Sequence, residues 1–414
     1  MNRTSLAALA ACSLAAGLCT SSAYSATAVS NAGADAGYLH GRLTTRDGAS
    51  YEGRLRWDDE EASWVDFFNS AKADNPWADE VPRRLRRSRG ESISLFGVEI
   101  ARKSGDEGRQ FVARFGDIAK IRVESGDEAT VWMKSGEKFD IEGGSNDVEA
   151  AVTVWDPKVG EIQVPWRRID TLEFTPGTAA AAAGAPARLH GTVETSSGSF
   201  TGTIQWDQHE CLATDKLDGE SDDSKVALVM GNLQAIERSG RRASKVTLKD
   251  GSTMELSGTN DVNDENRGIY VDDPRFGRVL IRWRAFERVR FTEGRAAAYA
   301  DFAPGKPLRG KVIDADGKTH AGRLVFDLDE SETWELLNGW HSDIEYSIPF
   351  GMVASITPIN DGESRVVLAN GEQLKLDGQT DVGGDNLGML IYETEGAKPT
   401  YVAWDDVERV EFEK

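Results

Sequence analysis

One sequence pattern occurs three times along this 414-residue chain, and it constrains the fold more than any other feature. Its clearest copy runs from Lys245 to Phe291. Apolar and polar residues alternate on both sides of Asp250-Gly251, a pair that readily takes the positive φ angles of a tight hairpin turn. An Asn/Asp-rich loop follows, and Trp283 then begins a closing Trp-x-x-Phe-x-x-Val-x-Phe pattern. Alternation with a period of two predicts paired β-strands.

The same hairpin, loop and closure occur in two other parts of the chain. The hairpin turns are Ser135-Gly136, Asp250-Gly251 and Asn370-Gly371, and the closures begin at Trp166, Trp283 and Trp404. A Leu-(His/Arg)-Gly start stands ahead of each copy, at Leu39, Leu189 and Leu308. Matched spacing over such lengths is typical of tandem structural units. The sequence therefore predicts three repeat units, at 37–175, 187–292 and 307–414.

Two linkers and one insertion complete this plan. Residues 176–186 and 293–306 are rich in Ala, Gly and Pro, which is typical of linkers. The first unit carries an insertion at 69–112 that has no counterpart in the other two. It contains a basic cluster within an acidic chain: Arg83, Arg84, Arg86, Arg87 and Arg89. An insertion of this length is either a functional loop or a disordered one.

The two halves of each unit are also alike. Both begin with a hairpin and end with apolar residues spaced by three, which suits a last strand entered through a 3₁₀ turn. Short strands, Gly turns and the lack of a long helical pattern predict an all-β chain. The pattern resembles SH3-like or Sm-like small barrels over nearly the whole chain after residue 36. The resemblance has no diagnostic motif, and it implies a fold only: two small barrels in each unit.

The first residues predict an export signal. Arg3 supplies a positive start, residues 6–18 form an apolar Ala/Leu run, and small residues follow. We expect a signal peptide over 1–25, with cleavage after Ser25 or Ala28, and disorder up to residue 36. The apolar run is too short to span a bilayer, and no later segment is as apolar. The sequence therefore predicts no transmembrane segment and a periplasmic or envelope-associated protein.

Cysteine positions agree with this interpretation. Residues 9–12 (LAAC) resemble a lipobox, so a lipid anchor at Cys12 is an alternative, although the apolar run before it is very short. After signal cleavage only Cys211 would remain, which excludes an intramolecular disulfide in the mature chain. Cys211 follows a strand pattern, and we expect an inert, half-buried thiol there.

The charge narrows the class of partner. The formal net charge is −21, and a field of this sign repels nucleic acid and anionic lipid surfaces. We therefore expect no nucleic-acid partner. The charge favours cationic partners or divalent cations.

A recurring aromatic-Asp-x-x-Glu element is the first candidate site. Its copies are Trp57, Asp58 and Glu61; Trp206, Asp207 and Glu210; and Phe326, Asp327 and Glu330. An acidic residue stands five positions after each Glu, at Asp66, Asp215 and Glu335. Carboxylate oxygens suit Ca²⁺, so each copy can be a divalent-cation cluster or part of a ligand-binding surface. Alternatively, the Asp accepts backbone N–H groups at a turn and the aromatic ring fills the core.

The Asn/Asp-rich loop of the middle unit is the second candidate. Asp261, Asn263, Glu265 and Asp272 stand at positions 1, 3, 5 and 12 of an EF-hand-like count. Position 6 is Asn266 where an EF-hand has Gly, position 12 is Asp where it has Glu, and no flanking helices are predicted. The other units lose most of these ligands. A turn capped by Asn and Asp side chains explains the same residues.

The basic cluster is the third candidate. It can bind an anionic partner, such as a phosphate-bearing envelope lipid, or pair with an acidic face of its own chain. Charge runs of this kind are usually solvated, which is the simpler interpretation.

Catalysis has little support in the sequence. No nucleophile elbow, zinc-protease motif or phosphate loop is present. His40 and His190 are equivalent, but Arg309 takes that place in the third unit, so neither has the mark of a required base. We predict a non-enzymatic exported protein that binds or scaffolds an unknown protein or envelope component and needs no cofactor. The alternatives are a Ca²⁺-stabilised structural protein and a hydrolase of envelope polymers that works through carboxylates.

Overall fold

The computed structural model describes residues 37–58, 60–77, 80, 109–143, 147–177, 184–222, 224–378 and 380–414. It also describes the backbone of two short strands, β4 (Ser94–Leu95) and β5 (Val98–Glu99), which pair with each other. The predicted signal peptide, the lipobox and the basic cluster lie outside the described residues.

The protein is all-β, as predicted. Strands make up 56% of the chain, and no helix of seven residues or more occurs in the part that the structure describes. The strands form two large antiparallel sheets, one of ten and one of twenty strands. Among the described residues, no helix is long and apolar enough to cross a membrane.

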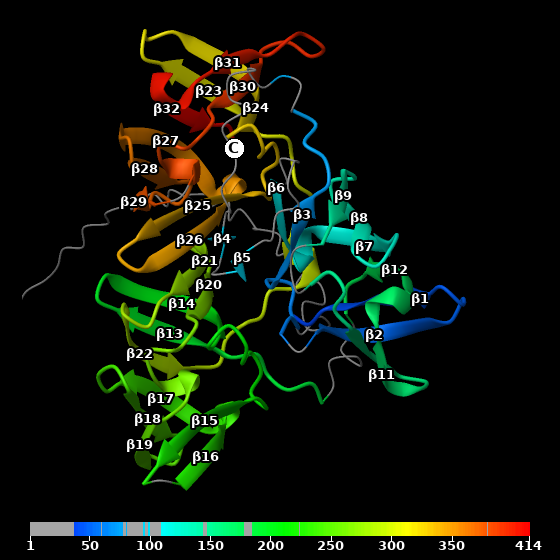
Figure 1. The fold of residues 1–414 in the computed structure, drawn as a ribbon, viewed down its shortest axis with the longest axis vertical. Coiled ribbons are helices and arrows are strands. Elements are labelled where there is room, and N and C mark those ends of the chain that lie inside the picture. The colour runs from blue at the N-terminus through cyan, green and yellow to red at the C-terminus, as the bar shows by residue number, and fades with distance from the viewer. Residues whose placement is uncertain are drawn as a thin grey trace, which may run out of the picture. The chain divides into compact units, whose positions relative to one another are not determined.

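The strands fall into three sets along the chain (Figure 1). The first set is the ten-stranded sheet: β1 (His40–Thr45), β2 (Ser50–Trp57), β3 (Phe67–Lys72), β6 (Arg109–Arg114), β7 (Ile118–Val123), β8 (Glu128–Met133), β9 (Lys138–Glu142), β10 (Val152–Asp156), β11 (Gly160–Val164) and β12 (Ile169–Phe174). The second set is β13 (His190–Thr195), β14 (Gly198–Gln205), β15 (Lys216–Ser221), β16 (Ser224–Val229), β17 (Leu233–Arg238), β18 (Ala243–Leu248), β19 (Thr253–Ser257), β20 (Ile269–Asp273), β21 (Gly277–Ile281) and β22 (Phe286–Phe291). The third set is β23 (Arg309–Asp314), β24 (Thr319–Phe326), β25 (Leu336–His341), β26 (Ile344–Pro349), β27 (Val353–Asn360), β28 (Glu363–Leu368), β29 (Gln373–Asp377), β30 (Met389–Tyr392), β31 (Thr400–Val402) and β32 (Val407–Phe412).

Strand pairing follows one order in all three sets. The first runs β11-β10-β2-β1-β12-β7-β8-β9-β3-β6. The second runs β21-β20-β14-β13-β22-β17-β18-β19-β15-β16, and the third runs β31-β30-β24-β23-β32-β27-β28-β29-β25-β26. The second and third sets join where β21 pairs with β26, with Val279 opposite Tyr346, and Figure 1 shows these strands side by side.

Single 3₁₀ turns lead into several of the closing strands, which is the geometry expected from apolar residues spaced by three. The turns are η1 (Phe115–Asp117), η2 (Trp166–Arg168), η3 (Met230–Asn232), η4 (Asn260–Val262), η5 (Tyr299–Asp301), η6 (Phe350–Met352), η7 (Thr380–Val382) and η8 (Trp404–Asp406). For example, η8 leads directly into β32, and Trp404 of this turn is buried.

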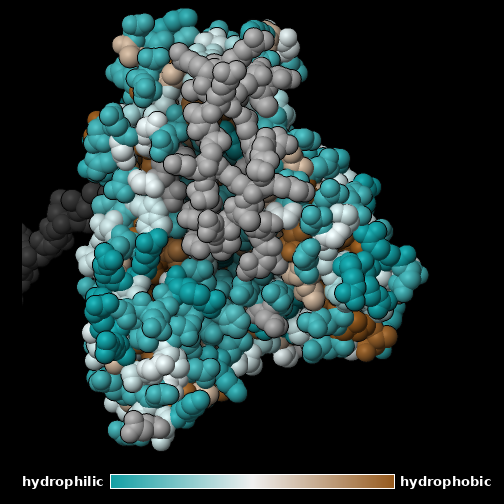
Figure 2. Space-filling view, in the orientation of Figure 1, coloured by the Kyte–Doolittle hydropathy of each residue, from teal (hydrophilic) through white to brown (hydrophobic). Residues whose placement is uncertain are grey.

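Two large apolar cores hold the sheets. One belongs to the first strand set and includes Trp57, and the other spans the second and third sets and includes Trp206 and Phe326. Each of these three rings is at most 1% exposed. The face drawn in Figure 2 is mostly hydrophilic where its residues are described, which suits a chain with its large apolar side chains inside.

The segment after β22, predicted as a linker, packs on the first strand set. Tyr299 and Phe302 belong to the core of that set. The Tyr299 hydroxyl donates to the Ile118 carbonyl at 2.8 Å, and the Lys134 ammonium donates to the Tyr299 carbonyl at 2.6 Å. Gly116 permits this contact, because a Cβ there would lie 2.4 Å from the Phe302 ring. The segment therefore joins strand sets that are distant in the sequence.

Candidate functional site

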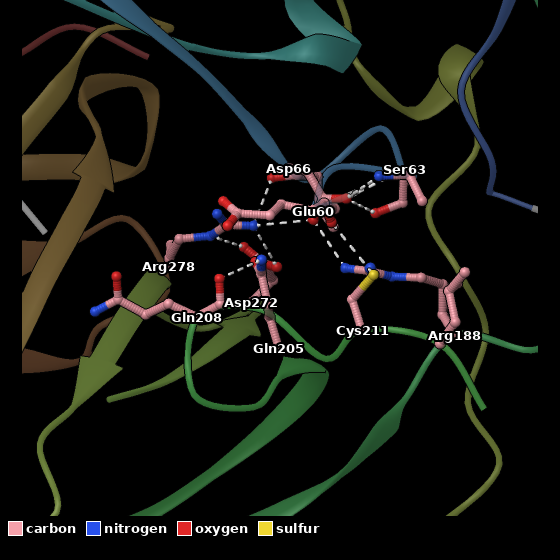
Figure 3. A network of polar contacts seen from close by, with 12 residues as sticks. Glu60, Ser63, Asp66, Arg188, Gln205, Gln208, Cys211, Asp272 and Arg278 are labelled. Carbon is pink, nitrogen blue, oxygen red and sulfur yellow. Dashed lines mark hydrogen bonds and ion pairs between the residues drawn. The ribbon is translucent and has the colours of Figure 1, made fainter. Parts of the chain in front are cut away.

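A buried ionic network joins the first and second strand sets, and Asp66 is at its centre (Figure 3). Asp66 Oδ2 accepts the backbone N–H groups of Ala62 and Ser63 at 2.9 and 2.8 Å. Its Oδ1 lies 2.8 Å from Arg188 Nη2 and 3.3 Å from Arg278 Nη2, and both arginines come from the second set. Burial alone would raise the pKa of Asp66, but the two guanidinium groups and the N–H donors lower it below its ordinary value.

Arg278 connects this network to the sheet of the second set. Its Nε donates to Asp272 Oδ1 at 2.9 Å, and its guanidinium lies 4.4 Å from the centre of the Phe67 ring and 5.0 Å from that of Tyr270. Phe67, Tyr270 and Leu280 also belong to one small apolar cluster. The charge is thus surrounded by aromatic rings and two carboxylates, which replace its lost hydration.

Glu335 and Asp215 correspond to Asp66 in the other two strand sets, and each has a similar pair of contacts. Glu335 accepts the backbone N–H groups of Ser331 and Glu332, and its other oxygen is 2.6 Å from Lys72 Nζ of the first set. Asp215 caps a turn in the same way and lies 3.9 Å from Arg56 of the first set. The acidic residue that follows each Asp-x-x-Glu element therefore caps a local turn and meets a cation of another strand set.

A cavity of about 690 Å³ lies beside this network. It is lined by side chains of all three strand sets and of the segment after β22, among them Phe67, Thr201, Arg278, Phe302 and Trp334. A volume of this size falls in the range of small-ligand sites.

The turn after β14 brings two predicted site residues together. Trp206 and Glu210 exchange backbone hydrogen bonds, with N···O distances of 2.7 and 2.9 Å. Asp207 and Gln208 lie between them with φ of 50° and 58°. Aspartate tolerates this left-handed conformation better than most residues. The tight turn places the carboxyls of Asp207 and Glu210 on the same side.

A third carboxyl, Asp261 of η4, joins these two. The Trp206 indole Nε1–H donates to the Asp261 carbonyl at 2.9 Å, and the Asp218 backbone N–H donates to Asp261 Oδ2 at 2.7 Å. These bonds hold Asp261 beside the turn. Oxygens of Asp207, Glu210 and Asp261 all lie within 4.8 Å of one another. We call these three residues the acidic triad.

The triad is buried and short of positive charge. Asp207, Glu210 and Asp261 are 1%, 8% and 6% exposed. Arg267 pairs with Asp207 at 3.1 Å, and His209 Nδ1 lies 3.1 Å from Glu210 Oε1. Burial raises the pKa of Asp261 to about 7; the Asp218 N–H opposes this rise, and the charges of Glu210 and Asp207 add to it.

The other strand sets have corresponding carboxyls. Asp58 and Asp327 have φ of 45° and 44°, and Glu61 and Glu330 close the same tight turn. The third members are Asp147, which accepts the Asn69 N–H at 2.6 Å, and Asp381, which accepts the Asn338 N–H at 2.6 Å. Burial raises the pKa of both Asp147 and Asp381 to about 7, and that of Glu61 and Glu330 well above the ordinary glutamate value.

The remaining predicted residues lie elsewhere. Trp57, Trp206 and Phe326 fill the cores and reach no surface. Of the EF-hand-like set, Asp261 joins the triad and Asp272 pairs with Arg278. Asn263 Oδ1 accepts the Glu265 backbone N–H at 2.8 Å, which is the capped turn that the sequence offered as its alternative interpretation. Cys211 is fully buried, and burial raises the pKa of its thiol to about 12, so it is unreactive.

Sequence reasoning missed the cations that connect the strand sets: Arg188, Arg278 and Lys72. Arg278 had one usable signal, since it opens the apolar run Val279-Leu280-Ile281 in a strand pattern, and a charge in such a place needs a partner. Arg188 and Lys72 had no such signal, because neither stands within an apolar run.

Chemically, three buried carboxyls can share protons or hold a hard cation. A carboxyl with a pKa near 7 beside a carboxylate is also a pair that acid–base catalysis can use. None of the triad residues lines the cavity beside Asp66.

Comparisons with protein-family models, curated proteins and solved structures found no match to this chain.

Proposed function

We propose that this chain is a non-enzymatic exported protein that binds or scaffolds a component of the cell envelope. We further propose that its three strand sets are tandem repeat units, each a pair of small barrels, at 37–175, 187–292 and 307–414. Support comes from the common order of strand pairing and from the common turn geometry at Asp58, Asp207 and Asp327.

The observation that carries the proposal is the cavity at the junction. Buried ion pairs stand at and beside its walls: Arg278, which lines the cavity, pairs with Asp66, and Lys72 pairs with Glu335, the residue after the lining Trp334. A pocket fixed before its ligand arrives costs less ordering free energy on binding. Its walls combine the apolar Phe67, Phe302 and Trp334 with hydroxyl and guanidinium groups. This lining suits a ligand with an apolar body and a few polar groups, such as a short segment of an envelope partner.

Filling the cavity tests this proposal. Thr201 lines the cavity and is exposed, and its cross-strand neighbour Thr192 does not line it. The hydroxyls of the two residues are 2.8 Å apart, so they occupy matched places in one hairpin. We expect Thr201→Trp to fold normally and to lose the partner that the wild-type protein retains from a solubilised envelope fraction. Thr192→Trp should retain it. Equal retention by both variants would contradict a role for the cavity.

A carboxylate-dependent hydrolase is the alternative from another class, and the raised pKa of Asp261, which lies beside two other carboxyls, favours it. It predicts turnover of cell-wall or glycan polymers that disappears in a variant with Glu61, Glu210 and Glu330 all replaced by Gln. The binding proposal predicts no turnover in the wild type.

Export has a separate test. We expect the protein purified from its native cell envelope to lack residues 1–25 or 1–28, because the apolar run at 6–18 is followed by small residues suited to signal cleavage. The intact mass reports this directly. A chain that begins at a lipid-modified Cys12 would indicate a lipid-anchored protein, and an unprocessed chain would contradict export.

A further inference from the structure

We propose that the acidic triad of Asp207, Glu210 and Asp261 is a Ca²⁺ site. This inference is independent of the cavity, because the triad and the cavity share no residue.

The spacing of the oxygens fits one shared cation. Ca²⁺ binds oxygen ligands at 2.3–2.6 Å, so two ligands of one ion can be at most about 5 Å apart. The triad offers one oxygen from each residue, all within 4.8 Å of one another. Several carboxylate oxygens are the kind of donor set that this ion prefers.

A second observation points to a ligand for the same place. Glu210 is 8% exposed, and its buried Oε2 has no hydrogen-bond partner, whereas Oε1 lies 3.1 Å from His209 Nδ1. A buried carboxylate oxygen without a donor costs free energy unless something else satisfies it. A divalent cation between the three carboxyls would do so.

The same unsatisfied atom occurs in each strand set. Oε2 of Glu61 and Oε2 of Glu330 are also buried and without a hydrogen-bond partner. These atoms occupy equivalent positions after equivalent turns, but among the described residues only the triad brings oxygens of three acidic side chains within 4.8 Å of one another. The unsatisfied Glu oxygen therefore recurs at this turn, and in the second strand set the other two carboxyls lie close enough to share a cation with Glu210.

Backbone hydrogen bonds hold two of the triad carboxyls in position. Asp207 accepts the Arg267 backbone N–H at 2.6 Å, and Asp261 accepts the Asp218 backbone N–H at 2.7 Å. Each bond comes from the backbone and keeps an oxygen oriented. Within the described residues, Arg267 and His209 are the only basic side chains that pair with the three carboxyls. The cluster is thus ordered in advance and electrostatically short of one or more positive charges.

Calorimetric titration of the full chain with Ca²⁺ tests the proposal. We expect one site in the wild type after chelator treatment and weaker binding in Glu210→Gln, which keeps the shape of the side chain and removes its charge. Affinity at the altered site should fall on the order of tenfold or more. Ca²⁺ at millimolar concentration should raise the melting midpoint of the wild type.

Glu265→Gln is the matched control. Glu265 is exposed and lies in the same acidic loop, and the EF-hand-like count makes it a ligand, whereas the triad does not include it. The proposal expects wild-type Ca²⁺ affinity in this variant. It is overturned by the absence of Ca²⁺ binding in the wild type, by loss of a site in Glu265→Gln with none lost in Glu210→Gln, or by unchanged binding in Glu210→Gln. If Glu210→Gln does not fold, Asp261→Asn gives the same comparison.

Discussion

Replacing Arg278 with Met is expected to lower the free energy of unfolding by about 3–5 kcal/mol, the usual cost of removing one partner from a buried ion pair. Met retains much of the apolar stem against Phe67 and Tyr270 but leaves Asp272 buried without its cation. Asp66 keeps Arg188, so the uncompensated charge is mainly that of Asp272. Urea unfolding followed by tryptophan fluorescence measures the loss.

Arg42→Met is the matched control for this prediction. Arg42 pairs with Glu52 at 2.8 Å, and both side chains are more than half exposed. A pair open to water contributes little to stability. A loss of similar size in both variants would contradict a special contribution from the buried network.

A second substitution distinguishes the effect of lost packing around Arg278 from the effect of leaving Asp272 without its cation. Adding Asp272→Met to Arg278→Met removes the orphaned carboxylate, and apolar replacement of a whole buried ion pair is often close to neutral. We expect the double variant to recover most of the lost stability. Failure to recover would mean that Arg278 acts through its contacts with Phe67 and Tyr270.

In the presence of a chelator, the melting midpoint should fall as the pH rises from about 4 to about 8. Burial raises the pKa of Asp147, Asp261 and Asp381 to about 7, against 3.8 for an unperturbed aspartate. In this interval the folded chain holds protons that the unfolded chain has released. Each such proton changes the free energy of unfolding by about 1.4 kcal/mol per pH unit.

The sign follows from the raised pKa values. The stabilisation from these carboxyls is complete below the unfolded pKa and is lost as the pH rises through the folded one. Asp66 acts in the opposite sense, because its pKa is lowered, so its contribution is lost only as the pH falls below 3.8. Stability should therefore be greatest in mildly acidic solution.

Replacing Asp147, Asp261 and Asp381 with Asn tests whether these three carboxyls cause the pH dependence. The amide keeps the acceptor oxygen for the backbone N–H groups but cannot titrate. We expect the triple variant to show a much flatter pH profile between 4 and 8 than the wild type, measured by differential scanning calorimetry. An unchanged profile would assign the pH dependence to other groups.

Much of the fold was predictable because its signals are local. Alternating residues around Asp250-Gly251 predicted a hairpin, and β18 and β19 pair across that turn, with Lys245 opposite Glu255. The apolar spacing that begins at Trp404 predicted a 3₁₀ turn followed by a strand, and η8 and β32 have this arrangement. Turn chemistry and side-chain alternation act within a few residues, so a single sequence displays them.

The candidate site was predictable only in part, for the same reason. Asp207 and Glu210 stand three residues apart, and one tight turn brings them together. Asp261 was assigned to an EF-hand-like loop, because spacing along the chain cannot reveal that the Trp206 indole binds its carbonyl. Arg188 and Lys72 were missed because their partners lie in other strand sets, as does Asp66, one of the two partners of Arg278.

The sequence by itself determined that this protein is all-β, where its hairpins turn, and which carboxyls stand at those turns. Only the tertiary structure decided that Asp261 completes a buried triad and that Asp66 receives two arginines from the second strand set. The reason is physical: backbone preferences and turn hydrogen bonds act over a few residues, whereas buried charges take their partners from whatever the packed sheets place beside them.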